Sequence, residues 1–110
     1  MNGEQVLGEN IADLAGLATA YDAYHLSLNG RPAPVIDGFT ADQRIYMGWA
    51  QNYRTKYREA AFRRAVITDV HAPGMYRALT VRNLDPWYAA FQVQPGQELY
   101  LAPDARVRIW

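Results

Sequence analysis

Two carboxylates, Glu9 and Asp13, stand one helical turn apart in the segment "LGENIADLAG", residues 7–16. At this spacing both side chains lie on the same helix face, where like charges repel each other. Most neighbouring residues are apolar, and a carboxylate removed from water must either become neutral or find a cation. The cation is either a metal ion or an arginine, whose planar guanidinium matches both carboxylate oxygens. A simpler interpretation stays open, with Glu9 in an exposed first turn and Asp13 on the surface.

A second pair of chemically capable residues is found in "HAPGMYR", where His71 and Arg77 are six residues apart around a Pro-Gly turn. An imidazole N–H can donate to a developing oxyanion, and a guanidinium can hold a carbonyl or carboxylate group. A single loop histidine is also typical of a capping or solvated residue. The pair alone therefore indicates chemistry without specifying it.

Aromatic and basic residues alternate in "YRTKYREAAFRR", residues 53–64. The pattern is compatible with a nucleic-acid surface, on which arginines contact phosphates and tyrosines stack on bases. It is equally typical of an amphipathic helix with a solvated basic face. The chain has 11 basic and 11 acidic side chains and a formal net charge of zero. This balance favours the helix, and nucleic-acid binding is not expected.

The carboxylates belong to a long predicted helix over residues 4–28, which Asn29 and Gly30 end. Apolar and small residues surround this helix on all sides between Ile11 and Tyr21, which predicts burial on most faces. A loop with two prolines and a glycine follows it.

Thr40 and Gln43 form the pattern of a capping box, and the second predicted helix extends from there to about Val66. Its inward stripe predicts core packing for residues spaced by four: Ile45, Trp49, Tyr53 and Tyr57. A short helix is expected from Pro73 and another at Pro86, capped by Asp85. An irregular tail ends on Trp110, so the predicted fold class is mainly α.

Length and composition limit the function classes further. The chain has 110 residues, half of them hydrophobic, which is the size of one modest domain. It contains no cysteine, so any metal must be bound by His, Asp or Glu. We expect no signal peptide in "MNGEQVLGEN" and no membrane-spanning segment, since no window approaches ~18 consecutive apolar residues.

Four motifs, in order and over nearly the whole chain, resemble the C-terminal end of the neprilysin and endothelin-converting-enzyme family of zinc metallopeptidases. They are "GENIADLAGLATAY", "WAQNYRTKYR", "TDVHAPGMYR" and the terminal "VRIW". The resemblance implies the helical C-terminal subdomain of a thermolysin-like, gluzincin-type catalytic domain, with residues 1–110 as a single unit. It also implies a parent enzyme that cleaves peptides and is periplasmic, secreted or membrane-associated.

The resemblance assigns a role to each candidate residue. "ENIAD" matches the family's ExxxD motif, in which the glutamate is the third zinc ligand and the aspartate orients a zinc-bound histidine. Glu9 and Asp13 would have these roles. His71 would stabilise the tetrahedral intermediate, and Arg77 would hold the substrate carbonyl while paired with Asp13.

The sequence departs from the family pattern in one respect that affects activity. It contains no HExxH, which supplies two histidine ligands and the catalytic base. The chain alone is therefore expected to be inactive, with the remainder of the catalytic domain as its partner. The alternative is a stand-alone helical module that binds a partner protein or itself through an exposed apolar face.

Overall fold

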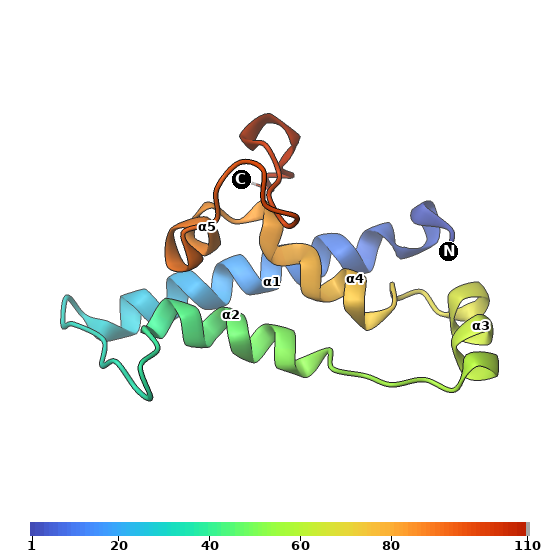
Figure 1. The fold of residues 1–110 in the computed structure, drawn as a ribbon, viewed down its shortest axis with the longest axis horizontal. Coiled ribbons are helices and arrows are strands. Elements are labelled where there is room, and N and C mark those ends of the chain that lie inside the picture. Colours follow the sequence, from blue (N-terminus) through green and yellow to red (C-terminus); the bar gives the residue numbers. More distant parts are fainter. Residues whose placement is uncertain (110) are drawn as a thin grey trace.

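The computed structural model describes residues 1–109, so Trp110 of the terminal "VRIW" motif lies outside the described residues. The helices labelled in Figure 1 are α1 (Gly3–Leu28), α2 (Ala41–Asn52), α3 (Glu59–Thr68), α4 (Gly74–Ala78) and α5 (Asp85–Phe91), and short 3₁₀ helices lie at Leu79–Asn83 (η1) and Pro103–Ala105 (η2). No β-strand occurs within residues 1–109, where the only ladder pairing is an isolated bridge between Ile36 and Phe39. The mainly helical prediction is confirmed.

Helix α1 ends where Asn29 and Gly30 predict and begins at Gly3, one residue before the predicted start. The Asn2 side chain accepts a hydrogen bond from the Glu4 N–H, which satisfies one of the free amides of the first turn. Asn29 adopts the left-handed conformation at the C-terminus, with φ of 50°, and its N–H donates to the Leu26 carbonyl. The helix therefore forms a 26-residue rod that places Glu9 and Asp13 on one face.

The prediction of one helix from Thr40 to about Val66 is wrong. The capping box is present, since Thr40 and Gln43 exchange hydrogen bonds, but α2 ends at Asn52. The chain is extended at 54–58 before α3 begins at Glu59. The extension carries Tyr57, which the helical stripe placed in the core, to a position where it is 49% exposed. Because α3 is also amphipathic, the spacing of apolar residues continues across the break. This periodicity therefore does not indicate that the helix is interrupted.

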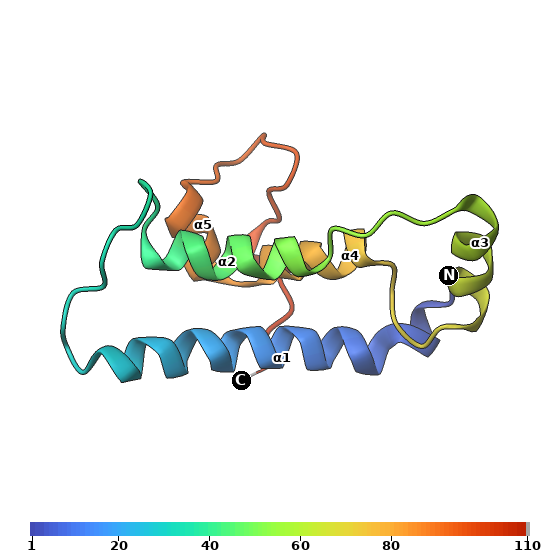
Figure 2. The same ribbon diagram turned by 90° about the horizontal axis from the view of Figure 1, so that it is seen from below.

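The helices form two layers. Figure 2 shows α1 as one layer and α2, α4 and α5 as the other, while α3 lies at the end of the molecule near the N-terminus. The buried core between the layers contains Leu17, Tyr46, Val81, Trp87 and Tyr88. Trp49 packs against this cluster, as its position in the stripe predicts.

The outer face of α1 is open, contrary to the prediction of burial on most sides. Ile11 is 44% exposed, and the exposed positions that follow carry small side chains: Ala12, Gly16, Thr19 and Ala20. In Figure 2, α2, α4 and α5 all lie on the other side of the rod, so no helix of residues 1–109 covers this face. No helix among these residues is both long enough and apolar enough to cross a bilayer.

Asp85 has a different role from the predicted helix cap. Pro86 stands in the first turn of α5, but the Asp85 carboxylate makes no capping bond and instead accepts hydrogen bonds from Arg106 and Arg108. These bonds lower the pKa of Asp85, Arg108 contributing most. The carboxylate therefore ties the irregular tail to α5, because two charged donors compete successfully with the helix amides.

Candidate functional site

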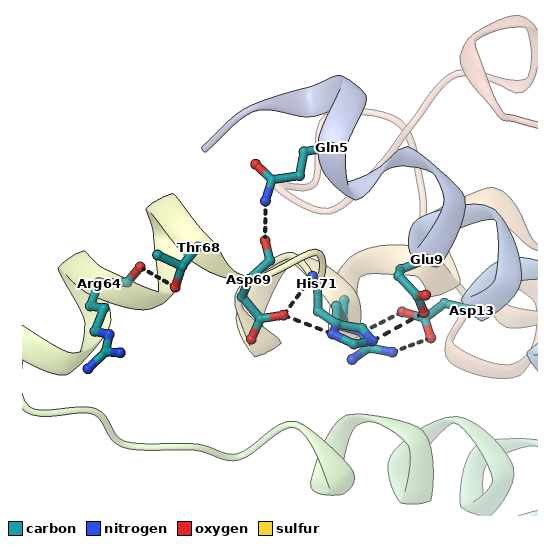
Figure 3. A network of polar contacts seen from close by, with 8 residues as sticks. Gln5, Glu9, Asp13, Arg64, Thr68, Asp69 and His71 are labelled. Carbon is teal, nitrogen blue, oxygen red and sulfur yellow. Dashed lines mark hydrogen bonds and ion pairs between the residues drawn. The ribbon is translucent and has the colours of Figure 1, made fainter.

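All four candidate residues lie in one cluster where α1 faces the segment before α4. Glu9 and Asp13 project from α1, and His71 approaches them from the loop between α3 and α4 (Figure 3). The His71 Nε2 is 3.2 Å from the Glu9 Oε2, and both side chains are about 40% exposed, at 40% and 43%. Residues 62 positions apart in the chain thus share one solvent-accessible surface.

Asp13 is the buried member of the cluster. Its side chain is only 9% exposed, and its two oxygens accept hydrogen bonds from Arg77 Nε at 2.6 Å and Nη2 at 2.7 Å. These bonds raise the pKa of Arg77, against the opposing effect of burial. Of the two cations that the sequence left open for this carboxylate, the structure places the arginine on Asp13, in the bidentate geometry that its planar fork favours.

Asp69 is a member of the site that the sequence argument missed. Its Oδ1 accepts a hydrogen bond from the His71 backbone N–H at 2.9 Å and lies 2.9 Å from the ring Nδ1. The backbone bond is the main cause of the lowered pKa of Asp69. The signal was present in "TDVHAPG", since aspartate commonly bonds to the backbone two residues later in a turn. Asp69 thereby fixes the ring with Nδ1 turned toward itself and Nε2 toward Glu9.

A contact from α1 also anchors the loop that carries His71. The Gln5 Nε2 donates to the Asp69 carbonyl oxygen at 3.2 Å (Figure 3). At the adjoining end of α3, the Thr68 hydroxyl donates to the Arg64 carbonyl within the last turn of the helix. The start of the loop is therefore held by α1 at Asp69, two residues before His71, and the Asp69 carboxylate in turn contacts the His71 ring.

Tyr53, which directly follows α2, also contacts the site. The Tyr53 hydroxyl is 3.4 Å from the Asp13 Oδ1, and its ring faces the Arg77 guanidinium, with 4.9 Å from the ring centroid to Cζ. Burial is the main cause of the raised pKa of Tyr53, followed by the charge of Asp13. The sequence predicted Tyr53 as a core residue, whereas it is half-buried against the ion pair.

A polar cavity of about 210 Å³ opens beside this cluster. Alternate side chains from the end of α2 onward line its wall, namely Tyr53, Thr55 and Tyr57, and His71 and Arg77 also line it. The intervening residues Arg54, Lys56 and Arg58 are exposed and do not line it. The cavity gives a ligand access to both of the candidate polar residues that can donate hydrogen bonds.

The donors of this chain do not by themselves fit a complete zinc site. Zinc in a catalytic site is normally bound by three protein ligands. Within residues 1–109 no group of three His, Cys, Asp or Glu side chains is arranged to hold a metal ion. The Glu9 carboxylate is solvent-accessible and can supply one oxygen ligand, while Asp13 is already engaged by Arg77.

Comparison with known proteins identifies the relatives of this chain. Residues 1–107 match the family model described as "Peptidase family M13". The chain is 38% identical over 112 residues to the neutral endopeptidase of Lactobacillus helveticus and 34% identical over 115 residues to human neprilysin. Each match covers 100% of the chain but only 16% and 15% of the relative. The chain therefore spans about a sixth of the length of these relatives.

A solved structure shows the same fold. The zinc metalloprotease Zmp1 of Mycobacterium tuberculosis, determined in an open state, superposes with a TM-score of 0.94 and 52% sequence identity. The structure of Zmp1 in complex with an inhibitor gives a TM-score of 0.95. Each match covers 98% of this chain and 17% of Zmp1. The helical arrangement described above thus also occurs within a much longer metalloprotease chain.

Proposed function

Because the chain belongs to peptidase family M13, we propose that it is the C-terminal part of a zinc endopeptidase catalytic domain, in which Glu9, Asp13, His71 and Arg77 form part of the active site. Residues 1–110 act as one unit in this proposal. The HExxH segment, with two histidine ligands and the catalytic base, belongs to the remainder of the enzyme, and the substrate is a peptide.

One observation carries the proposal: residues more than 60 positions apart in the sequence meet as two directly contacting pairs, Glu9 with His71 and Asp13 with Arg77. A fold that needed only stability has no use for a solvent-accessible carboxylate beside a histidine whose ring is fixed by a third residue. Such a chain of contacts is typical of active sites, where each side chain must hold a defined orientation.

The chemistry of these residues suits peptide-bond hydrolysis. His71, oriented by Asp69, can donate a ring N–H to the oxyanion of a tetrahedral intermediate. Arg77, with two nitrogens on Asp13, can hold the substrate carbonyl oxygen with the third. Glu9 is the proposed zinc ligand of the intact enzyme. The chain alone lacks a complete metal site in its described part, and we propose that it is inactive without its partner segment.

Metal analysis of the intact enzyme tests the role of Glu9. Glu9→Gln is expected to reduce bound zinc well below one per chain after dialysis, because a neutral amide is a poor zinc ligand. Glu98→Gln changes an exposed carboxylate in the tail and is the matched control, with zinc expected to stay bound. Full zinc retention by Glu9→Gln would remove Glu9 from the metal site.

Kinetics of the same enzyme test His71. His71→Ala is expected to retain zinc but to lose on the order of a hundredfold or more in kcat, as for removal of an oxyanion donor. The 110-residue chain, assayed alone with the same peptide and zinc, is expected to show no hydrolysis above buffer. Zinc-dependent hydrolysis by this chain alone would contradict the proposed division of the active site.

A further inference from the structure

Two aromatic residues near the C-terminal end of α2 contact Arg77, one at its backbone and one at its guanidinium. The Trp49 Nε1 donates a hydrogen bond to the Arg77 backbone carbonyl at 3.2 Å, and the Tyr53 ring faces the guanidinium, with 4.9 Å between the centroid and Cζ. The two rings pack edge to face with centroids 5.0 Å apart. We propose that Trp49 and Tyr53 are positioning residues that fix the backbone and the side chain of Arg77 for substrate binding. The inference rests on the proposed role of Arg77.

The ion pair with Asp13 is not the only contact that orients the Arg77 guanidinium. It engages Nε and Nη2, and among the hydrogen bonds of residues 1–109 Nη1 has no acceptor. The free nitrogen is useful to a substrate only if the guanidinium plane is held steady. The Arg77 Cζ lies over the Tyr53 ring, and the Tyr53 hydroxyl is 3.4 Å from the Asp13 Oδ1. One side chain thus contacts both members of the pair and restricts their common orientation.

The close approach of α4 to the end of α2 makes these contacts possible. A Cβ atom at Gly74 would lie 2.9 Å from the Tyr53 carbonyl oxygen and 3.4 Å from the Tyr53 Cβ. Only a glycine allows this separation without displacement of the backbone. Because α4 begins at Gly74, the same approach places the Arg77 carbonyl within reach of Trp49. Gly74, Trp49 and Tyr53 therefore act together on one arginine.

Kinetics in the longer peptidase that carries this chain distinguish positioning from general stability. Tyr53→Leu removes the aromatic face and is expected to raise KM on the order of tenfold, with kcat changed much less. Tyr53→Phe keeps the aromatic ring, loses only the long hydroxyl contact with Asp13 and is expected to raise KM much less than Tyr53→Leu. Trp49→Phe keeps an aromatic ring, loses only the N–H donor and should raise KM in the same direction. Tyr76→Leu removes an exposed aromatic residue from α4 as the control for nonspecific perturbation.

A readout that does not depend on catalysis separates this inference from the proposed function. By NMR of the 110-residue chain, exchange of the Arg77 Nε–H with water is expected to accelerate about tenfold in Tyr53→Leu and not in Tyr53→Phe or Tyr76→Leu. Faster exchange in this chain, together with no peptidase activity in the longer protein, would support the positioning and contradict the proposed function. Unchanged exchange and KM in both Tyr53→Leu and Trp49→Phe, or equal effects in Tyr76→Leu, would overturn the inference.

Discussion

Asp13 and Arg77 are 64 residues apart in the sequence and form a bidentate ion pair, with hydrogen bonds of 2.6 and 2.7 Å. The pair joins α1 to α4, which otherwise belong to different layers of the molecule. It places a permanently charged group beside the cavity while satisfying a buried carboxylate. The same contact therefore contributes to the fold and to the proposed active site.

Removal of one member of this pair is expected to destabilise the chain. Asp13→Asn leaves Arg77 without its anionic partner, and we expect the free energy of unfolding to fall by about 2 kcal/mol. The loss is smaller than for a fully buried pair because 20% of the Arg77 side chain remains exposed. Urea unfolding measures the change. Glu59→Gln, in the exposed i, i+4 pair with Arg63, is the control and should have almost no effect.

Replacement of two glycines by alanine is expected to change the free energy of unfolding in opposite directions. Gly74→Ala is expected to lower the free energy of unfolding by about 1–3 kcal/mol, because the new methyl group would meet the Tyr53 carbonyl. Gly8→Ala introduces the same atom on the open side of α1, where nothing lies within 4 Å. It is expected to raise stability by about 0.5–1 kcal/mol through helix propensity. Thermal unfolding of both variants checks the contrast, and equal effects would contradict the close approach.

The contact between Asp69 and His71 predicts a pH dependence. Hydrogen bonds from His71 lower the folded-state pKa of Asp69 from 3.8, so the carboxylate is favoured in the folded state. Its stabilising contribution is complete above the unfolded pKa and is lost as the pH falls through the folded value. Carbon NMR of the Asp69 carboxyl group should give a midpoint below 3.8, and His71→Ala should move it upward. Because the alanine variant keeps the backbone N–H, a midpoint insensitive to that substitution would exclude the contact with the His71 ring.

The raised pKa of Tyr21 predicts a second pH dependence of stability, at alkaline pH. Burial, assisted by the hydrogen bond to Asp42, raises its pKa from 10.0 to about 12. A raised pKa favours the protonated phenol in the folded state, so this contribution to stability is complete below 10.0 and declines as the pH rises toward 12. Spectrophotometric titration should show one tyrosine fewer ionising at high pH in Tyr21→Phe. Asp42→Asn should lower the Tyr21 midpoint.

The apolar surface of α1 and α4 leads us to propose that the isolated chain self-associates. Leu7, Ile11 and Tyr76 are 54%, 44% and 51% exposed and line one groove. Exposed apolar surface of this kind drives association in the absence of its normal partner. Light scattering after size exclusion should show a mass that grows with concentration, and Leu7→Lys should reduce it. A constant monomer mass at high concentration would contradict the proposal.

Local signals in the sequence were sufficient to predict several elements. The capping residues around α1 and the Thr40 capping box specify helix ends through bonds over two or three residues, and these bonds do not depend on the rest of the fold. The break after Asn52 was not predictable in this way. Tyr53, the residue that follows α2, lies against Gly74 and Arg77, and these contacts exist only once the chain has folded.

The candidate site likewise combines residues that the sequence predicted with residues that it did not. The spacing of Glu9 and Asp13 indicated that they share a helix face, the residue types in "HAPGMYR" indicated His71 and Arg77, and the resemblance to a family gave these residues their roles. The helical periodicity placed Tyr53 in the core because an apolar stripe does not distinguish a ring against other rings from a ring against an ion pair. The role of Asp69 depends on a turn geometry, and its sequence signal was too short to stand out.

The extended segment 54–58 imposes a constraint on chain length. Its alternation places Thr55 and Tyr57 toward the cavity and Arg54, Lys56 and Arg58 toward solvent. Deletion or insertion of a single residue would exchange the two sets and turn positive side chains toward Arg77. A change of two residues would preserve the alternation. Variation in the length of this connection should therefore be tolerated in even steps, whereas the loop at 29–40, remote from the cavity, carries no such restriction.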